Sequence, residues 1–388
     1  METSSNTSDS RGKLPSESDR TAAAGCESNG LHKKLDQLKS HNAPIGHWHR
    51  PATITKNDFK YKSLSAWSLN IAVGCGHGCL FCYVPSTSTN KLKPHLANYG
   101  VSNPDHEWGQ YVLLRTWDEK EFVRSLIKAE TTPIGELNPD GNRAVLLCST
   151  TDPYQVIPHP DAKTRGQLMK ESAKMVRRAL ELILNESTLN VRILTRSPLA
   201  KRDFDLFQKF GDRLLFGMSL PTLDNSLAKV YEPGAPSPSL RLKTLQEAKA
   251  AGIPVYVAVA PTYPECDDRD LEATLRAVKA LHPVTIFHEP INVRAENVKR
   301  IAQHAASLGV ELKTDVFASP RAWRSYALSA LRSVERIATD LGITDRLHLW
   351  PDSSLGSKEA LKEVEDPITH AEWLVRCWAR VSEWPGKP

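Results

Sequence analysis

The chain has 388 residues, of which 40% are hydrophobic, and a formal net charge of +5 at pH 7. This length allows one large domain with extensions or two domains. No apolar run approaches the roughly 18 residues that argue for a transmembrane helix, so no membrane partner is expected. Seven cysteines without a secretory signal indicate a reducing compartment, the cytoplasm, rather than disulfide bonds.

The start of the chain, residues 1–40, is predicted to be a disordered tail. Residues 1–30 are rich in Ser, Thr, Gly and charge and nearly free of aliphatic side chains, so they cannot bury enough apolar surface to offset the entropy of ordering. Residues 33–62 then mix Lys, Arg and His with aromatic residues. Such a segment can bind single-stranded nucleic acid, although a solvated segment that wraps the following domain is the commoner explanation.

The most informative motif comes next, at residues 70–83, which read NIAVGCGHGCLFCY. It places Cys75, Cys79 and Cys82 within one glycine-rich loop after a short apolar run. A cubane iron–sulfur cluster normally takes four thiolates, one for each iron. Three thiolates therefore leave one iron without a protein ligand, and an open metal position is where chemistry occurs, as at catalytic zinc sites.

The residues between the cysteines bear on the kind of metal. We expect Gly74, Gly76 and Gly78 to let the backbone fold around a cluster, because glycine reaches positive φ without steric cost. His77 could complete a set of four zinc ligands, but its place between the first two cysteines is cramped for a tetrahedron. Zinc sites commonly use two separated ligand pairs. The loop thus favours a cluster, and a zinc- or iron–sulfur-containing nucleic-acid-binding module without enzymatic activity is the alternative.

From about residue 65 the sequence alternates short apolar or β-branched runs with longer helical periods, the pattern of a parallel α/β sheet. The predicted strands are 66–73, 144–148, 189–195, 214–219, 255–260 and 284–288. The predicted helices are 118–130, 164–184, 240–251, 270–281 and 295–308. Beyond these elements the pattern changes, and we expect residues 311–388 to be a mainly helical C-terminal extension around a short LHLWP run.

Polar residues follow several of the predicted strands. The stretch CSTTDPYQ at 148–155 follows the second strand, Arg196 follows the third and Ser219 ends the fourth. In barrels built from parallel strands and helices, the reactive groups gather at the carboxyl ends of the strands. An arginine at such a strand end is suited to bind a carboxylate. Helix caps and turns explain each residue alone equally well. Their repetition at successive strand ends is what favours a site.

Together, these motifs resemble the radical S-adenosylmethionine (SAM) superfamily and, within it, the spore photoproduct lyase and DNA repair photolyase-like branch. The resemblance covers roughly residues 65–292 and rests on GC-x-HGC-x-FCY, TTDPYQ, TRSPLAKRD, MSLPTLD, YEPGAPSPSLRL and AGIPVYVAVAPTYP. It implies an α/β fold in which residues 41–310 form a partial (β/α)6 TIM-type barrel of radical SAM type, between the disordered tail and the helical extension.

The same resemblance implies an activity. A reduced [4Fe-4S] cluster would cleave S-adenosyl-L-methionine to methionine and a 5′-deoxyadenosyl radical, which abstracts hydrogen from a substrate, while the protein places and shields these groups. Nucleic acid is the candidate substrate, and a reductant such as flavodoxin or ferredoxin is the expected partner. Both the substrate and the reductant come from the resemblance alone.

Matched residue by residue, the resemblance makes Cys75, Cys79 and Cys82 the cluster ligands. Other family positions contact the adenine, the amino-acid part and the ribose of SAM. These positions fall on Phe81, Thr151, Asp152, Arg196, Ser219 and Ala260.

The candidate catalytic residues are Cys148 and Tyr83. The cysteine that donates hydrogen in the lyase falls on Ser149 here, and the available thiol is Cys148. Because successive strand residues point to opposite faces, Cys148 either points away from the pocket or is redirected by a local bulge; a small buried hydrophobe is the other explanation. Tyr83 matches a tyrosine proposed for radical relay. Phe81 replaces a family tyrosine and has no hydroxyl, which argues against the lyase's own reaction.

Two further pairs of residues carry weaker predictions. Glu232 and Arg241 bracket the sequence GAPSPSL and are expected to pair across that loop, in support of its structure rather than in contact with substrate. His288 and Glu289 end the last predicted strand, where they could face the pocket or simply pack.

Overall fold

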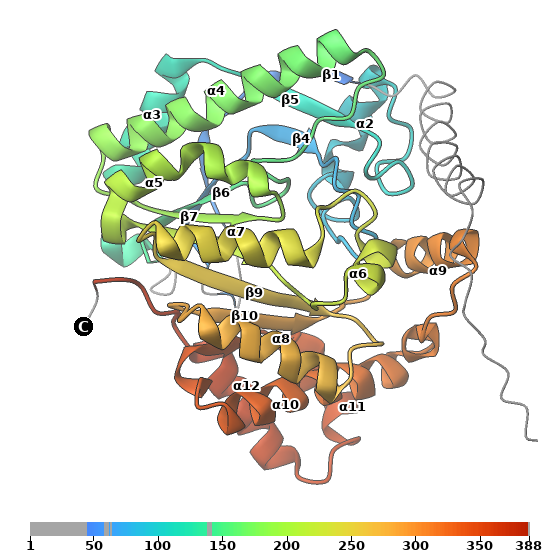
Figure 1. The fold of residues 1–388 in the computed structure, drawn as a ribbon. Helices are drawn as coiled ribbons and strands as arrows, with labels where there is room; N and C mark the ends of the chain where they lie inside the picture. The colour runs from blue at the N-terminus through green and yellow to red at the C-terminus, as the bar shows by residue number, and fades with distance from the viewer. Residues whose placement is uncertain (1–44, 58–61, 63, 138–141, 387–388) are drawn as a thin grey trace, which may run out of the picture. The chain divides into compact units, whose positions relative to one another are not determined.

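The computed structural model describes residues 45–57, 62, 64–137 and 142–386 (Figure 1). The predicted tail of residues 1–40 therefore lies outside the described residues. None of the described helices is long and apolar enough to cross a lipid bilayer.

A sheet of eight strands forms the centre of the described chain, in the order β11-β10-β9-β8-β7-β6-β3-β2. All of its neighbouring strands are parallel except β2, which runs antiparallel to β3. The strands are β2 (Ile54–Lys56), β3 (Trp67–Leu69), β6 (Ala144–Leu147), β7 (Asn190–Thr195), β8 (Leu214–Ser219), β9 (Val255–Thr262), β10 (Ile286–Pro290) and β11 (Leu347–Leu349). Sequential parallel strands joined by helices confirm the predicted α/β class, and no ladder between the described edge strands closes the sheet.

The α-helices of the described residues are α2 (Lys93–Leu96), α3 (Glu119–Glu130), α4 (Ala162–Glu186), α5 (Phe204–Phe210), α6 (Asn225–Tyr231), α7 (Pro238–Ala250), α8 (Asp268–Ala280), α9 (Asn297–Leu308), α10 (Pro320–Asp340), α11 (Lys358–Leu361) and α12 (Pro367–Ala379). The five predicted helices correspond to α3, α4, α7, α8 and α9, whereas α2, α5 and α6 were not predicted and the helices beyond residue 310 had no predicted bounds. Most of the longer ones begin after an Asp or Ser whose side chain accepts a backbone N–H of the first turn, which satisfies a donor that the helix itself leaves free. These caps are Asp118, Asp161, Ser237, Asp267, Ser319 and Asp366.

The first predicted strand, 66–73, is wrong as a single element. The chain leaves the large sheet after β3, and its continuation β4 (Ala72–Gly74) joins a separate three-stranded sheet with β1 (Ile45–Pro51) and β5 (Val112–Thr116), in the order β1-β5-β4. Asn70 lies at the break, where its side chain hydrogen-bonds Thr150 and Ser149 at the end of β6. Both halves are buried, so burial gives no sign of such a change of partner, and within the run only the polar Asn70 marks its position.

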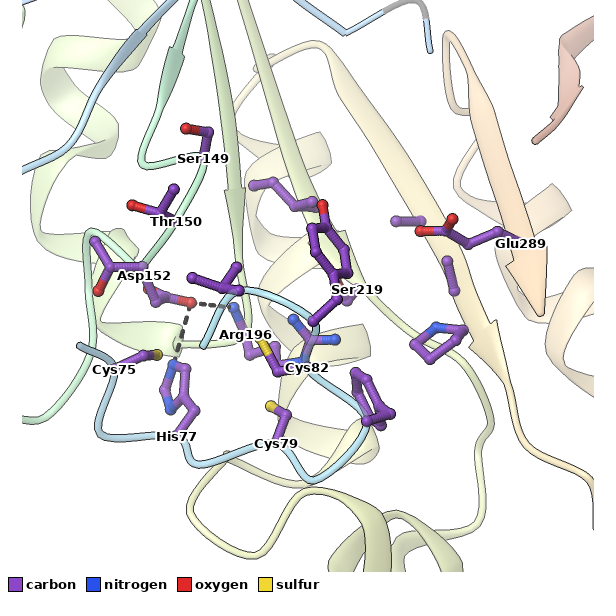
Figure 2. Close-up of a pocket in the computed structure, with 18 of the residues that line it drawn as sticks. Cys75, His77, Cys79, Cys82, Ser149, Thr150, Asp152, Arg196, Ser219 and Glu289 are labelled. Atoms are coloured by element: carbon purple, nitrogen blue, oxygen red, sulfur yellow. Dashed lines mark hydrogen bonds and ion pairs between the residues drawn. The ribbon is translucent and has the colours of Figure 1, made fainter. Parts of the chain in front are cut away.

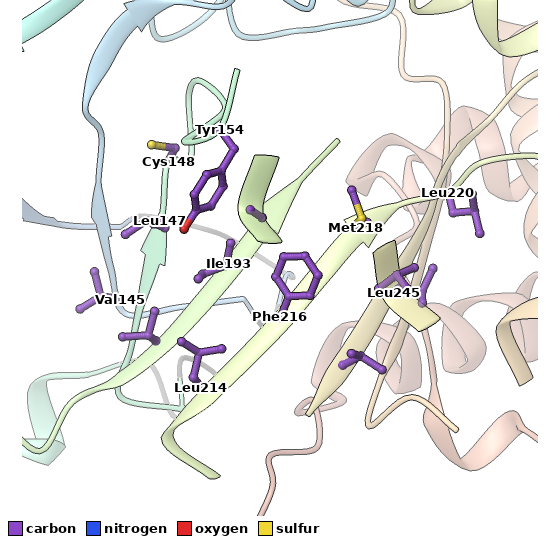
Figure 3. Packing of buried hydrophobic residues seen from close by; sticks show 14 of the residues in the cluster. Val145, Leu147, Cys148, Tyr154, Ile193, Leu214, Phe216, Met218, Leu220 and Leu245 are labelled. Atoms are coloured by element: carbon purple, nitrogen blue, oxygen red, sulfur yellow. The ribbon is translucent and has the colours of Figure 1, made fainter. Parts of the chain in front are cut away.

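Alternation along the strands builds two apolar layers. Ile193, Phe216 and Met218 point to the face covered by helices, where they belong to one apolar cluster with Leu245 of α7 (Figure 3). Their neighbours along the strands, such as Leu215, pack on the other face with Tyr256, Phe287, Trp350 and Trp384. This period of two is the geometry of any strand. Since both faces are buried, the strands read as continuous apolar runs.

Residues beyond 310 contribute to the sheet as well as to helices. β11 pairs in parallel with β10, so that Leu347 lies opposite Ile286. The Trp350 ring, just after β11, stacks on Phe287 with centroids 4.4 Å apart, and α10 packs on α8 and β10. The division between a core of residues 41–310 and an extension of residues 311–388 stays a prediction.

The packing of the helix-covered face predicts a stability effect. Phe216 has no exposed surface and lies with Phe204 and Phe207 at centroid distances of 5.5 and 5.6 Å. Phe216→Ala should lower the free energy of unfolding by about 3–5 kcal/mol, because the cavity left behind adds to the lost transfer free energy. Urea unfolding measures this. Ile368→Ala, at a side chain 73% exposed, should change the free energy by no more than about 0.5 kcal/mol; equal effects would contradict the assigned packing.

Candidate active site

One pocket lies at the carboxyl ends of the parallel strands. All of the site residues predicted from the sequence line it, and Figure 2 labels several of them. They are Cys75, Cys79, Phe81, Cys82, Tyr83, Cys148, Thr151, Asp152, Arg196, Ser219 and Ala260. The fold thus brings together residues that are far apart in the sequence, while their chemical roles stay predictions.

Three of these residues are free cysteines on the loop after β4. Burial raises the pKa of each thiol, to about 12 for Cys79, so a metal must displace thiol protons when it binds. Among the residues that the structure describes, no three His, Cys, Asp or Glu side chains form a group that could hold one metal ion. A cubane cluster takes each thiolate at a different iron, so its ligands surround a volume and need not converge on one point.

Glycines shape the cysteine loop in two different ways. Gly74 and Gly78 have φ of +91° and +56°, the left-handed region in which glycine alone is unstrained. The expectation of a positive φ is wrong for Gly76, whose φ is not positive. A Cβ at Gly76 would instead overlap the carbonyl oxygen of Val156. Close approach of two backbone segments, rather than an unusual dihedral angle, requires a glycine at this position.

Two residues after β6 fasten the first half of the cysteine loop. The Thr151 hydroxyl donates to the carbonyl of Gly74 at 2.6 Å. Gln155 accepts from the backbone N–H of Gly76 at 2.6 Å and donates to Thr151 at 2.7 Å. Gln155 was not singled out from the sequence, although it belongs to the TTDPYQ motif. Thr151, predicted to contact SAM, is therefore also a support of the loop.

Asp152 ties this loop to the next strand. Its carboxylate accepts the Thr195 hydroxyl at 2.7 Å and the backbone N–H groups of Arg196 and Tyr154 at 2.9 and 2.8 Å, and it lies 3.1 Å from Nε2 of His77 (Figure 2). Burial by itself raises the pKa of Asp152, but His77 and the hydrogen bonds from Arg196 and Thr195 outweigh burial and lower it. The carboxylate therefore stays ionised, with its acceptor sites largely occupied by the protein itself.

A buried charge network lies beside Cys79. Arg196 Nε donates to Glu232 at 2.7 Å, and Arg241 pairs with the other oxygen of the same carboxylate, which confirms the predicted pairing of Glu232 with Arg241. Burial raises the pKa of Glu232, but the two guanidinium groups outweigh burial and lower it to about 2. Two cations and one anion leave one net positive charge at this wall. The Arg196 guanidinium also lies 5.5 Å from the centroid of the Phe81 ring.

Helix α9 holds the second half of the loop. Arg300 donates to the carbonyls of Leu80 and Cys82 at 3.0 and 2.7 Å. Asn297 donates to the carbonyl of Phe81 at 3.1 Å. The sequence predicts this helix but not its role, because nothing in its apolar periodicity reports a contact with a loop more than two hundred residues earlier.

The far side of the pocket contains residues that the sequence indicated only weakly. Glu289 lines the pocket, 2.6 Å from Nζ of Lys62, whereas its neighbour His288 is buried and hydrogen-bonds the carbonyl of Val259 at 2.9 Å. Burial lowers the pKa of His288 to about 4, so this imidazole is neutral. Lys62 belongs to the basic segment predicted to bind nucleic acid or wrap the domain. Trp350, from the LHLWP run, completes this side.

Cys148 borders both the pocket and an apolar cluster. Its backbone has a φ of +64°, which is uncommon for a residue with a side chain, and it lies among the cluster residues that include Leu147 and Tyr154 (Figure 3). Burial raises the pKa of its thiol, so the side chain is neutral. The residue thus combines features of both predicted explanations, a redirected strand end and a small buried hydrophobe.

Comparison with known proteins gives matches along most of the chain. The family model described as the radical SAM superfamily matches residues 69–278. The uncharacterized protein ORF301 of Acidianus two-tailed virus is 31% identical over 255 residues, which are 64% of this chain and 75% of the viral protein. The uncharacterized protein MJ0683 of Methanocaldococcus jannaschii is 25% identical over 270 residues, or 69% and 85% of the two chains.

Solved structures with a similar fold include spore photoproduct lyase. Its complex with dinucleoside spore photoproduct has a TM-score of 0.53 and 14% identity, covering 79% of this chain and 81% of the lyase. A mutant of the lyase with bound AdoMet and the same dinucleoside has a TM-score of 0.54 at 14% identity, with coverage of 80% and 82%. At this level of identity the likeness shows the fold alone.

The close approach at Gly76 predicts a local effect on metal binding. Gly76→Ala should displace the loop from Val156 and lower the iron bound per chain after anaerobic reconstitution to less than about half, since metal sites tolerate small displacements of their ligands poorly. Iron analysis and visible absorbance measure this. Gly166→Ala is the matched control because a Cβ there meets nothing within 4 Å; it should keep the iron and stabilise α4 by up to about 1 kcal/mol. Full iron binding by Gly76→Ala would contradict the assigned role.

Proposed function

The chain belongs to the radical SAM superfamily and is a radical SAM enzyme, and from this premise we propose that Cys75, Cys79 and Cys82 bind a [4Fe-4S] cluster with SAM beside it. When bound, these groups would supply the chemistry, which is the reductive cleavage of SAM to methionine and a 5′-deoxyadenosyl radical able to abstract hydrogen from a substrate. The observation that carries this proposal is the convergence of the three thiols with Arg196 and Ser219 on one pocket.

The surroundings of the cysteine loop suit a cluster. Glycines let neighbouring backbone segments pack closely against the loop on one side, and hydrogen bonds from the β6 loop and from α9 hold its backbone on the others. The network of Arg196, Arg241 and Glu232 has a net positive charge next to Cys79. Such a charge stabilises thiolates and the anionic cluster that they would bind, because the attraction is weakly screened in a buried site.

Several lining residues have the chemistry that SAM requires. Nε of Arg196 is taken by Glu232, which orients the rest of the guanidinium group for the carboxylate of SAM. The Ser219 hydroxyl is proposed to contact the ribose, and Phe81 and Ala260 the adenine. Arg196 is 18% exposed and the other three also line the pocket.

We propose that Thr151 and Asp152 support SAM binding in part indirectly, by holding other residues of the site in place. Both line the pocket, but their polar atoms are engaged with the cysteine loop and the end of β7. They would therefore hold the ligands of the cluster and the backbone of Arg196 in place. Their own contacts with SAM would use acceptor capacity that these hydrogen bonds leave free.

Nucleic acid is the proposed substrate, and a flavodoxin or ferredoxin the proposed electron donor. The fold likeness to spore photoproduct lyase, solved in complex with a dinucleoside, supports the substrate, as does the net positive charge. Tyr83 is the stronger candidate for a catalytic side chain because it is 39% exposed and lines the pocket. Cys148 is the weaker one, since its thiol is buried beside an apolar cluster.

The cysteine assignment predicts a sharp contrast between two variants. Cys79→Ala should lose the brown colour and reduce dithionite-dependent release of 5′-deoxyadenosine from SAM to background, because a cluster ligand is missing. Cys148→Ala should keep both, since this thiol is not assigned as a ligand. Anaerobic purification with chromatography of the products measures the release. Loss of colour in Cys148→Ala, or a colourless zinc protein without this product, would favour the alternative of a metal-containing binding module.

The role of Arg196 predicts a change in SAM affinity. Arg196→Gln should raise the apparent KM for SAM by about 10- to 100-fold, the value of one charge-assisted hydrogen bond. Arg196→Lys should recover part of this loss, because lysine restores the positive charge but not the paired N–H donors of a guanidinium group. Initial rates of 5′-deoxyadenosine formation at varied SAM concentrations measure the effect. An unchanged KM in both variants would remove Arg196 from the binding site.

A further inference from the structure

An ion pair lies at the end of the pocket that the cluster and SAM do not require. Nζ of Lys62 is 2.6 Å from Oε2 of Glu289, and the two side chains are only 22% and 16% exposed. Figure 2 shows Glu289, at the end of β10, on the far side of the pocket from Cys75 and His77. Both members of the pair line the same pocket as the cysteines.

Lys62 keeps its charge in spite of burial. Burial lowers the pKa of Lys62, but the carboxylate of Glu289 outweighs burial and raises it. Removing two charges from water costs several kcal/mol for each ion, and the attraction between them often does no more than offset that cost. An ion pair of this kind contributes little to stability. Its place in the pocket therefore points to recognition.

Aromatic rings fix the position of the ammonium group. Nζ of Lys62 lies 4.9 Å from the Trp350 ring centroid and 5.8 Å from that of Tyr83, distances at which a cation is attracted to a ring face. Trp350 is itself held by its stack on Phe287 and is 7% exposed, whereas Tyr83 is 39% exposed. Trp350 thus backs the lysine, and Tyr83 offers a ring face on which a flat ligand can lie.

The pair presents a donor and an acceptor side by side. An ammonium group has three N–H donors and no acceptor, and an ionised carboxylate has only acceptors. Lys62 donates one N–H to Oε2 of Glu289, whereas Oε1 of Glu289 has no hydrogen-bond partner among the described residues. The carboxylate disfavours an anionic ligand and the ammonium disfavours a cationic one. A neutral group with its own acceptor next to its own N–H satisfies both.

We infer that Lys62 and Glu289 recognise the polar edge of a neutral planar ring that lies against Tyr83, with Lys62 donating to a ring carbonyl oxygen and Glu289 accepting from the adjacent ring N–H. Cyclic amides and imides, as in nucleobases that carry N–H beside C=O, have this edge. The inference rests on the proposed function and deepens it by naming the part of the substrate that the protein recognises, the edge of a ring that carries N–H beside C=O. It also gives the C-terminal segment a role, since Trp350 follows β11.

The test compares two probes that differ by one methyl group. Thymidylyl-(3′→5′)-thymidine carries the N–H beside C=O, and its N3-methylated form lacks the donor at nearly the same shape. Calorimetric titration of the reconstituted full chain with SAM should show about tenfold or tighter binding of the unmethylated probe, the value of one hydrogen bond to a charged group. Lys62→Met/Glu289→Met removes both charges together, and the preference should then fall to within about twofold.

The control is an exposed ion pair elsewhere in the chain. Lys201 and Glu247 are 2.9 Å apart and outside the pocket, so Lys201→Met/Glu247→Met should keep the preference for the unmethylated probe. Equal affinity of the wild-type chain for both probes, or binding of neither, overturns the inference without any variant. A preference that persists in a folded Lys62→Met/Glu289→Met variant also overturns it. Release of 5′-deoxyadenosine by the wild-type chain without a probe tests the proposed function separately.

Discussion

The buried carboxylate of Asp152 is the interaction on which the pocket depends. It joins the end of β6 to the cysteine loop through His77 and to the end of β7 through Thr195 and the backbone of Arg196. The carboxylate is ionised because these partners outweigh the cost of burial. Through this one group, the position of the cysteine loop is coupled to the position of the arginine proposed to hold SAM.

The cysteine loop is held from opposite sides by elements that are far apart in the chain. Thr151 and Gln155 hold its first half, and Asn297 and Arg300 of α9 hold its second half. Most of these hydrogen bonds go to or from backbone groups of the loop, so they set the path of the chain and leave the thiols free. A site that must place a reactive cofactor accurately gains from such support, because small displacements of reacting groups cost large factors in rate.

The pocket has two walls of different character. Around the cysteines many polar groups are paired with one another, as in the network of Arg196, Glu232 and Arg241. On the other wall Lys62 and Glu289 keep donors and an acceptor available beside aromatic rings. The first wall suits a permanent cofactor, which benefits from rigidity. The second suits a ligand that enters and leaves, because its polar groups can exchange one partner for another.

The sequence by itself determined the cysteine loop, the parallel α/β class and the residues at the strand ends, because each depends on spacing along the chain and parallel strands end at one edge. Only the tertiary structure decided that β3 and β4 belong to different sheets, and that Thr151 and Asp152 bond to the protein. It also brought together Lys62 and Glu289, which are 227 residues apart. Local periodicity reports which face of an element is buried, whereas the partner of a buried polar group depends on how distant segments pack.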